Sequence, residues 1–195
     1  MDYSKAIASH LQESAAVKLK TAQTCLDEIN TAVKAISQSI TEKHKILICG
    51  NGGSAADAQH IAAEFIVRLS HRLERPAIPA LALTTDTSVL TAAGNDIGFE
   101  NIFARQVQAF GQSGDILLAI STSGNSVNIL KAIRQAKHNN LYTIALLGKN
   151  GGQCKEAADL SIIVPSDSTQ HIQEAHITIG HIIVELVEKT LYATR

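Results

Sequence analysis

Two short turns rich in Gly, Ser and Asn could bind an anion. GNGGSAAD at residues 50–57 and STSGNS at residues 121–126 each follow an apolar run and lead into a helical segment. Backbone N–H groups at a helix N-terminus, joined by hydroxyl donors, form a site for an anion, most often phosphate. For one such loop, helix capping and turn formation are the simpler interpretation. Two loops at neighbouring strand ends favour a phosphate ligand.

The known nucleotide motifs are incomplete in both loops. Neither loop has the lysine that a P-loop requires. GNGGSA at residues 50–55 matches G-x-G-x-x-A, but Asp86 follows much later than the acidic residue expected after about 20 residues in dinucleotide-binding units. A phosphate on a small polar molecule therefore suits the loops better than a nucleotide.

A histidine and a glutamate stand one helical turn apart just beyond the first loop. His60 and Glu64 share a face of the expected helix over residues 54–70, among alanines. A solvated i,i+4 pair is the simplest interpretation. Burying either side chain without a partner is costly, however, and the helix opens directly from a candidate phosphate loop. The pair is therefore a candidate part of the site.

The C-terminal segment over residues 170–191 is apolar around nearly its whole circumference, which predicts a buried helix, with a subunit contact as one way to bury it. Glu174, His181 and Glu185 fall on one stripe of this helix, and Gln173 and His176 lie to its side. Any one of them could be a satisfied polar group in the core. Several on one apolar helix favour a site.

The elements that carry these residues follow from hydrophobic periodicity. Apolar residues recur every three or four positions from Ile7 to Ile40, which predicts a helical arm with one break near Thr24. Its stripe must pack on its own body or on another subunit. After Lys45, apolar runs alternate with helical segments, which is typical of an α/β fold with a parallel sheet covered on both faces. Ligands bind beyond the carboxyl ends of such strands. The strands are expected at residues 45–50, 77–85, 115–123, 142–148 and 160–166, and the helices between them at 54–70, 87–93, 99–110, 126–138 and 151–157.

Composition limits the class of protein. A chain of 195 residues fits one domain, and a net charge of −1 gives no basic surface for nucleic acid. No apolar stretch reaches the 18 residues of a membrane span, and the N-terminus does not read as a signal peptide. Cys25, Cys49 and Cys154 are scattered without a CxxC motif, which indicates a reduced, cytoplasmic setting, and Cys49 is expected in the core.

Four blocks carry a resemblance that runs in order from about residue 45 to 190. CGNGGSAADAQHIAAE, ALTTDTSVLTAAGNDIGFENIF, GDILLAISTSGNSVNILKAI and HIQEAHITIGHIIVELVE resemble the phosphoheptose isomerases, a family with the sugar isomerase (SIS) fold. The resemblance implies an SIS-type three-layer sandwich, with a five-stranded parallel sheet flanked by helices. Residues 1–195 would form a single SIS domain, with an N-terminal helical arm at 1–43 for oligomerisation and an α/β core at 44–195.

The resemblance also implies roles for particular residues. Glu64 would be the base and His181 its acid–base counterpart, while zinc (Zn²⁺) would be bound by His60, Glu64, Gln173 and His181. Gln173 and His181 are eight residues apart, about 12 Å along an ideal helix, so shared binding of one ion would need long reaches, an irregular helix or ligands from different subunits. Sugar contacts would come from Asn51, Gly52, Gly53, Glu64, Asn95, Asp96 and Gln173, and phosphate contacts from Ser54, Ser121, Thr122, Ser123 and Ser126.

The implied activity is conversion of D-sedoheptulose 7-phosphate to D-glycero-D-manno-heptose 7-phosphate through an enediol(ate). This is the first step of ADP-heptose or GDP-heptose synthesis for lipopolysaccharide core or another surface polysaccharide. The family forms homotetramers with active sites at subunit contacts, where His181 of one copy could approach Glu64 of another. The chain departs from the family at His171, preceded by Gln170, where an arginine is usual.

Two other functions fit the same fold. A related SIS tetramer binds the replication initiator protein, and a sugar-phosphate sensor needs only the two loops. Glu64 and His181, which the initiator-binding relative does not retain, favour the enzyme.

Overall fold

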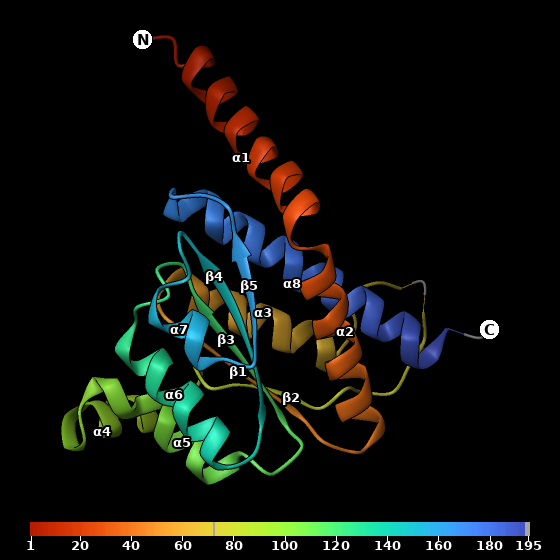
Figure 1. Cartoon of the computed structure of the whole chain (residues 1–195), viewed down its shortest axis with the longest axis vertical. Coiled ribbons are helices and arrows are strands. Elements are labelled where there is room, and N and C mark those ends of the chain that lie inside the picture. Colours follow the sequence, from red (N-terminus) through yellow and green to blue (C-terminus); the bar gives the residue numbers. More distant parts are fainter. Residues whose placement is uncertain (72, 194–195) are drawn as a thin grey trace.

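A five-stranded parallel sheet forms the centre of the computed structural model, which describes residues 1–71 and 73–193 (Figure 1). The strand order is β2-β1-β3-β4-β5. The inner strands β1 and β3 are buried along their whole length, because helices cover both faces. The predicted α/β class and five-stranded parallel sheet are confirmed. The strands are β1 (Ile46–Gly50), β2 (Ala80–Ala82), β3 (Ile116–Ser121), β4 (Tyr142–Gly148) and β5 (Leu160–Val164).

The edge strand β2 is shorter than the predicted 77–85. Only three residues pair with β1, in the register Ile46↔Ala80 to Ile48↔Ala82. Pro79 precedes them and has no N–H to donate, although its carbonyl accepts from Ile46 N at 3.0 Å. The hydrophobic run is therefore real, but only its middle is strand.

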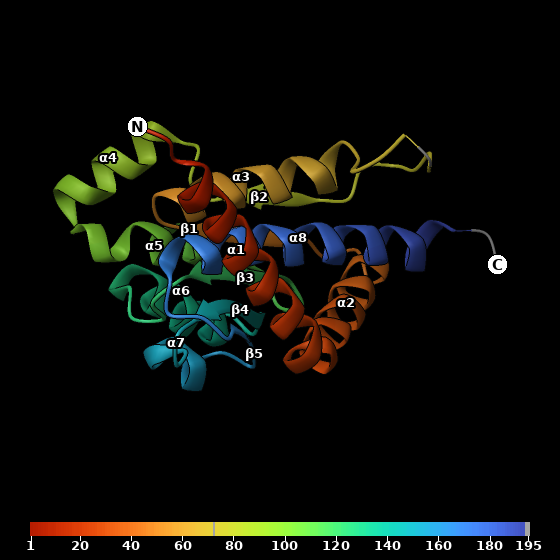
Figure 2. The same cartoon turned by 90° about the horizontal axis from the view of Figure 1, so that it is seen from above.

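Helices form the two outer layers of the sandwich (Figures 1 and 2). One core cluster joins one face of the sheet to α2, α3 and α8, and a second joins the other face to α4, α5, α6 and α7. The helices are α1 (Ser4–Thr24), α2 (Leu26–Thr41), α3 (Gly53–Ile66), α4 (Thr87–Asp96), α5 (Ile102–Phe110), α6 (Val127–His138), α7 (Gly152–Ala157) and α8 (Thr169–Tyr192), with a 3-10 turn at Phe99–Asn101.

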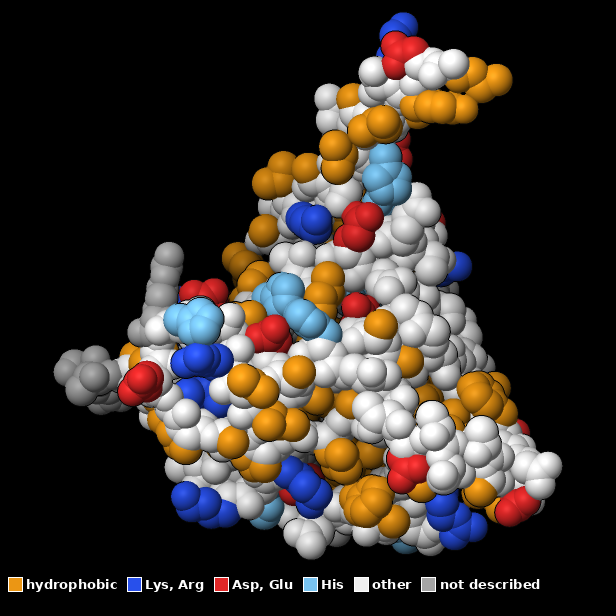
Figure 3. Space-filling model, turned by 180° about the vertical axis from the view of Figure 1, so that it is seen from behind, with side chains coloured by type: hydrophobic (Ala, Val, Ile, Leu, Met, Phe, Trp, Pro, Cys, Tyr) orange, Lys and Arg blue, Asp and Glu red, His pale blue; other side chains and the backbone are white. Residues whose placement is uncertain are grey.

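The N-terminal arm breaks at Cys25, as the sequence predicts, and its apolar stripe divides there. The α2 half packs on the body of the chain, where Ile29 and Ile36 are buried. The α1 half projects away from the body, and its Ile7 and Leu11 remain 59% and 64% exposed. Figure 3 shows hydrophobic side chains along this projecting helix. Within one chain, the stripe is therefore only half covered.

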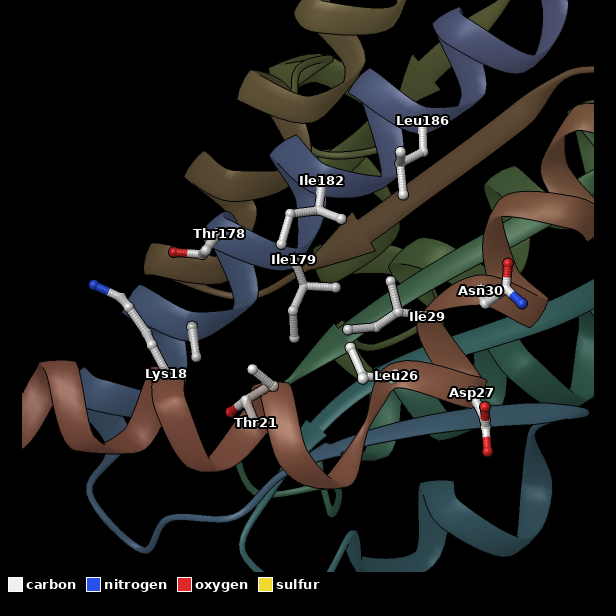
Figure 4. Close-up of a pocket in the computed structure, with 12 residues that line it drawn as sticks. Lys18, Thr21, Leu26, Asp27, Ile29, Asn30, Thr178, Ile179, Ile182 and Leu186 are labelled. Carbon is white, nitrogen blue, oxygen red and sulfur yellow. The ribbon is translucent and has the colours of Figure 1, made fainter.

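Helix α8 is buried on its sheet side and keeps a second apolar face. Ile183 and Val187 are fully buried, whereas Ile182 and Leu186 are each 38% exposed. These exposed residues line a groove of about 420 Å³ between α8 and the junction of α1 with α2 (Figure 4). The predicted burial of this helix is therefore confirmed on the side that faces the sheet, and a subunit contact over its other side stays a prediction.

The cysteines lie in the core, as expected for Cys49. Cys25, Cys49 and Cys154 are buried free thiols. Burial raises the pKa of the Cys49 thiol and brings that of Cys154 to about 11, which is typical of core residues rather than nucleophiles. No helix in the described part of the chain is long and apolar enough to cross a membrane.

Candidate active site

The two predicted loops meet at the carboxyl edge of the sheet. Strands β1 and β3 are parallel neighbours, and Gly50 pairs with Ile120 at their ends. The order β2-β1-β3 also makes this the point where the chain changes direction across the sheet, which is the usual ligand site of such folds. The neighbouring positions of the two loops are therefore confirmed.

A pair of amides joins the loops. Asn51 Nδ2 donates to Asn128 Oδ1 and Asn128 Nδ2 donates to Asn51 Oδ1, each at 2.8 Å. Asn128 is only 3% exposed, so these bonds satisfy a buried amide. The sequence analysis missed Asn128; an amide among the apolar residues of VNILKAI was the available signal.

The first loop allows close approach of a ligand or a neighbouring side chain. Gly52 has a φ of +56°, and no side chain caps α3. The Gln173 amide packs on Gly53, where a Cβ would lie 2.0 Å from Gln173 Nε2. Gly53 therefore brings the first turn of α8 against the N-terminus of α3.

In the second loop, the serines divide between turn formation and open positions. Gly124 N donates to Ser121 Oγ at 3.1 Å, and Asn125 N donates to Ser123 Oγ at 3.2 Å. These two hydroxyls therefore stabilise the turn, as the simpler interpretation holds. Ser126 occupies the cap position of α6 without a side-chain capping bond, and its hydroxyl accepts a hydrogen bond from Ser121 Oγ at 3.3 Å. Its hydroxyl therefore does not cap the helix.

His60, Glu64 and His181 converge within one chain. His60 Nε2 lies 2.8 Å from His181 Nε2, and the two rings meet edge to face. His60 Nε2 is also 3.5 Å from Glu64 Oε1. The shared face of His60 and Glu64 is therefore confirmed. His181 reaches them from the same copy, so a second subunit is not needed to complete the trio.

The helices hold this trio by close packing. A Cβ at Gly180 would lie 2.6 Å from Ile61 Cδ1, so only glycine lets α8 approach α3 this closely. Near the end of α3, the buried Arg75 donates to the Glu64 backbone oxygen at 2.7 Å and pairs with Glu188 of α8 at 2.6 Å. The sequence analysis did not anticipate the role of Arg75.

The predicted zinc ligands fit a metal in chemistry and partly in position. Two imidazoles and a carboxylate are a common zinc donor set, and His60, Glu64 and His181 lie side by side. In the described part of the chain, however, their ligand atoms do not all lie within 4.8 Å of one another. Gln173 contacts Gly53, seven residues before His60 on α3.

Two predicted sugar contacts, Asn95 and Asp96, have no observed hydrogen bond or ion pair with the described residues of this cluster. Asn95 and Asp96 are exposed at the C-terminal end of α4, where Asn95 Nδ2 donates to Asp96 Oδ1 at 2.7 Å. Asp86 caps α4 by accepting from Val89 N at 3.0 Å, consistent with its exclusion as a nucleotide ligand.

Asp57 is a titratable group that the sequence analysis missed. It lies on α3 one turn before His60, is only 8% exposed, and its Oδ2 has no hydrogen-bond partner. Burial raises the pKa of this carboxyl to about 6, and the nearby charge of His60 opposes the rise. Its burial should therefore make stability depend on pH.

Comparisons with known proteins agree on one family. The SIS domain model matches residues 9–148. A phosphoheptose isomerase from Chlorobaculum tepidum is 49% identical over 190 residues, which cover 97% of this chain and 91% of that protein. The structure of a phosphoheptose isomerase from Neisseria gonorrhoeae matches with a TM-score of 0.91 and 39% identity, over 96% of this chain and all of that one. A phosphoheptose isomerase from Francisella tularensis gives a TM-score of 0.92 at 38% identity, over 97% of this chain and all of that one.

Replacing Asp57 with Asn should change how stability depends on pH. The folded-state pKa of about 6 lies above the ordinary value of 3.8, so the folded protein holds a proton that the unfolded chain has lost between these values. The free energy of unfolding should fall as pH rises through this window because of Asp57, and Asp57→Asn should remove that fall. Urea unfolding at several pH values measures it, with exposed Asp167→Asn as the control. A constant difference between wild type and Asp57→Asn across the window would contradict the assignment.

Proposed function

Because the chain belongs to the phosphoheptose isomerases of the SIS-domain family, and is therefore a sugar-phosphate isomerase, we propose that it converts D-sedoheptulose 7-phosphate to D-glycero-D-manno-heptose 7-phosphate. The observation that carries this proposal is the meeting of His60, Glu64 and His181 on the two helices that also bring Gln173 against the first loop.

The chemistry requires a base and an acid in one place. Interconversion of a ketose and an aldose moves a proton between C1 and C2 through an enediol(ate). Glu64 takes the proton from carbon and returns it to the neighbouring carbon, while His181 exchanges a proton with the oxygens. The half-buried Glu64 beside His60 supports this division of roles.

The spacing of the site suits a long sugar phosphate. His60 follows Gly53 by seven residues on α3, which is about 10 Å of helix. The phosphate and the reacting C1–C2 end are at opposite ends of a seven-carbon chain. The two loops would hold the phosphate with Ser54, Ser121, Thr122, Ser123 and Ser126, and the sugar would lie along α3 toward Glu64, which orients the reacting carbons. Asn51, Gly52, Gly53 and Gln173 are the proposed sugar contacts, with Asn95 and Asp96 joining them only if α4 moves or another copy supplies them.

Zinc is the proposed metal, with His60, Glu64, Gln173 and His181 as its ligands. A bound Zn²⁺ polarises the substrate carbonyl and stabilises negative charge on its oxygen. The convergence of His60 and His181 supports the site. Gln173 would have to turn from Gly53 toward these side chains.

The proposed place of the reaction is the first step of ADP-heptose or GDP-heptose synthesis for a surface polysaccharide such as lipopolysaccharide core, in the cytoplasm. The alternatives are an SIS tetramer that binds the replication initiator protein and a sugar-phosphate sensor. Both need the fold and loops only. The trio of acid–base side chains favours the enzyme.

The proposed active unit is a homotetramer with its sites at subunit contacts. The exposed stripe of α1 and the groove beside Ile182 and Leu186 leave a large apolar surface on one chain, which soluble monomers rarely expose. Symmetric copies would cover both surfaces.

Replacing Glu64 with Gln should lower turnover by about 100-fold or more while substrate still binds, because the amide keeps the size of the side chain but removes its basicity. NMR of sedoheptulose 7-phosphate in D₂O measures both product and deuterium uptake at C1 and C2. Glu185→Gln, at an exposed position on α8, is the matched control. Near-wild-type turnover and deuterium uptake in Glu64→Gln would remove Glu64 from the mechanism.

Replacing Ser126 with Ala should raise KM by about 10-fold or more, since a hydrogen bond to a charged group contributes about 1.5–3 kcal/mol. The helix should be unaffected, because Ser126 does not cap α6 through its side chain. Calorimetry with phosphorylated and unphosphorylated sedoheptulose separates the roles. If both sugars lose affinity equally, the hydroxyl does not bind phosphate.

Light scattering should give four times the chain mass of 20.8 kDa. Replacing Leu11 with Glu should lower that mass, because a charge on the exposed stripe of α1 opposes its burial between copies. Lys20→Glu, a charge change on the same helix outside the apolar stripe, is the control. An active monomer of wild-type protein at assay concentration would overturn the tetramer.

A further inference from the structure

A second group of metal-ligand side chains lies where α1 meets α8. His10 comes from α1, and His171 and Glu174 come from the first turns of α8; one ligand atom of each lies within 4.8 Å of the others. It is the one such group of His, Cys, Asp and Glu side chains in the described residues. It shares no residue with the proposed zinc ligands of the active site.

The distances within the group are compatible with a shared metal ion. His10 Nε2 lies 3.5 Å from Glu174 Oε1, and His171 Nδ1 lies 3.3 Å from Glu174 Oε2. Hydrogen bonds of this type are usually about 2.7–3.2 Å long. Ligands about 2.0–2.1 Å from a tetrahedral zinc ion lie roughly 3.3–3.4 Å from one another. The two His–Glu separations are close to that length, and they end on different oxygens of the Glu174 carboxylate.

We propose that His10, His171 and Glu174 bind a divalent transition-metal ion of the zinc class, which fastens the projecting helix α1 to the first turns of α8. His10 Nε2, His171 Nδ1 and the Glu174 carboxylate are the ligands. Water, or a ligand from another molecule, completes the fourth position. This site is independent of the proposed isomerase reaction.

The surrounding side chains are arranged as those around metal ligands usually are. Glu13 Oε2 lies 3.6 Å from His171 Nε2, the ring nitrogen opposite the proposed ligand atom, so a carboxylate stands beside the nitrogen that would carry the proton. Ser14 Oγ donates to Glu174 Oε2 at 2.5 Å. The Gln170 amide lies 3.5 Å from His10 Nδ1, and turning the amide over would place its oxygen to accept that N–H.

The local charge also favours a cation. Two carboxylates, those of Glu13 and Glu174, face two histidines, and the nearest lysine contact is Lys18 Nζ to Ser14 Oγ at 3.2 Å. His171 is only 4% exposed, so solvent screens this part of the group weakly. With neutral rings, the group carries two negative charges against one lysine, and a divalent ion would balance them.

Metal binding here has a structural consequence. Gln173 lies between His171 and Glu174 in sequence and packs on Gly53 of the candidate active site. An ion that joins α1 to this turn of α8 therefore fixes both the direction of the arm and the turn that carries Gln173.

The test uses the full chain, freed of metal, in a His60→Ala/His181→Ala background that removes the proposed active-site ligands. Zn²⁺ calorimetry should still find one equivalent, and Co²⁺ should give the visible spectrum of a tetrahedral site. His10→Ala should abolish this binding. Glu13→Gln should weaken it by about 10-fold or more, as removal of a partner of a ligating histidine does. His138→Ala, an exposed histidine on α6, should change nothing.

Hydrogen exchange gives a readout besides stoichiometry. Zn²⁺ should slow amide exchange across α1 in the background protein and not in its His10→Ala variant. The proposal is overturned if His10→Ala binds Zn²⁺ with unchanged stoichiometry and Kd. It is also overturned if the background protein binds no ion. Protection of α1 by lower pH in that case would identify a protonated histidine between carboxylates. Neither result bears on isomerase activity, which the Glu64→Gln comparison tests separately.

Discussion

The close contact of α3 with α8 is the interaction on which the site depends. Gly180 lets Ile61 press against the α8 backbone, and Gln173 packs on Gly53 at the other end of the contact. These two contacts hold α3 and α8 together, and His60 and His181 meet between the two helices. The buried ion pair between Arg75 and Glu188 joins the chain near the end of α3 to the C-terminal part of α8. Loss of either partner would leave an uncompensated charge. The geometry of the acid–base trio is therefore a property of helix packing.

The sheet supplies a second, independent constraint. Parallel strands with short βα turns bring the ends of β1 and β3 to one edge, and the Asn51–Asn128 amide pair joins the turns. The sheet thus fixes the loops proposed to bind phosphate, and the helices fix the side chains proposed to transfer protons. A substrate that spans both would be oriented by its phosphate before its reacting carbons meet Glu64.

The N-terminal arm has an apolar stripe that a single chain covers only in part. Its α2 half shares the core of the domain, whereas α1 touches the body mainly along α8. Helix α1 therefore has apolar surface to offer to other copies and a polar contact, at Glu174, to hold its direction. The contact at Glu174 involves the same turns of α8 that carry Gln173, so the proposed assembly through α1 would be linked to the site.

By itself, the sequence determined the parallel α/β class, the break of the arm near Thr24 and the two loops rich in Gly, Ser and Asn. Each of these follows from a local property, namely hydrophobic periodicity, glycine placement or turn chemistry. It also placed His60 and Glu64 on one face, since they are four residues apart in a helix. It did not reveal the roles of Asp57 or Arg75, which come from burial or from partners far along the chain, and for Asn128 it offered only an amide within an apolar helix as a signal. Only the tertiary structure decided that His181 meets His60 within one copy, because the distance between two helices depends on the residues at their contact, such as Gly180, which has no side chain.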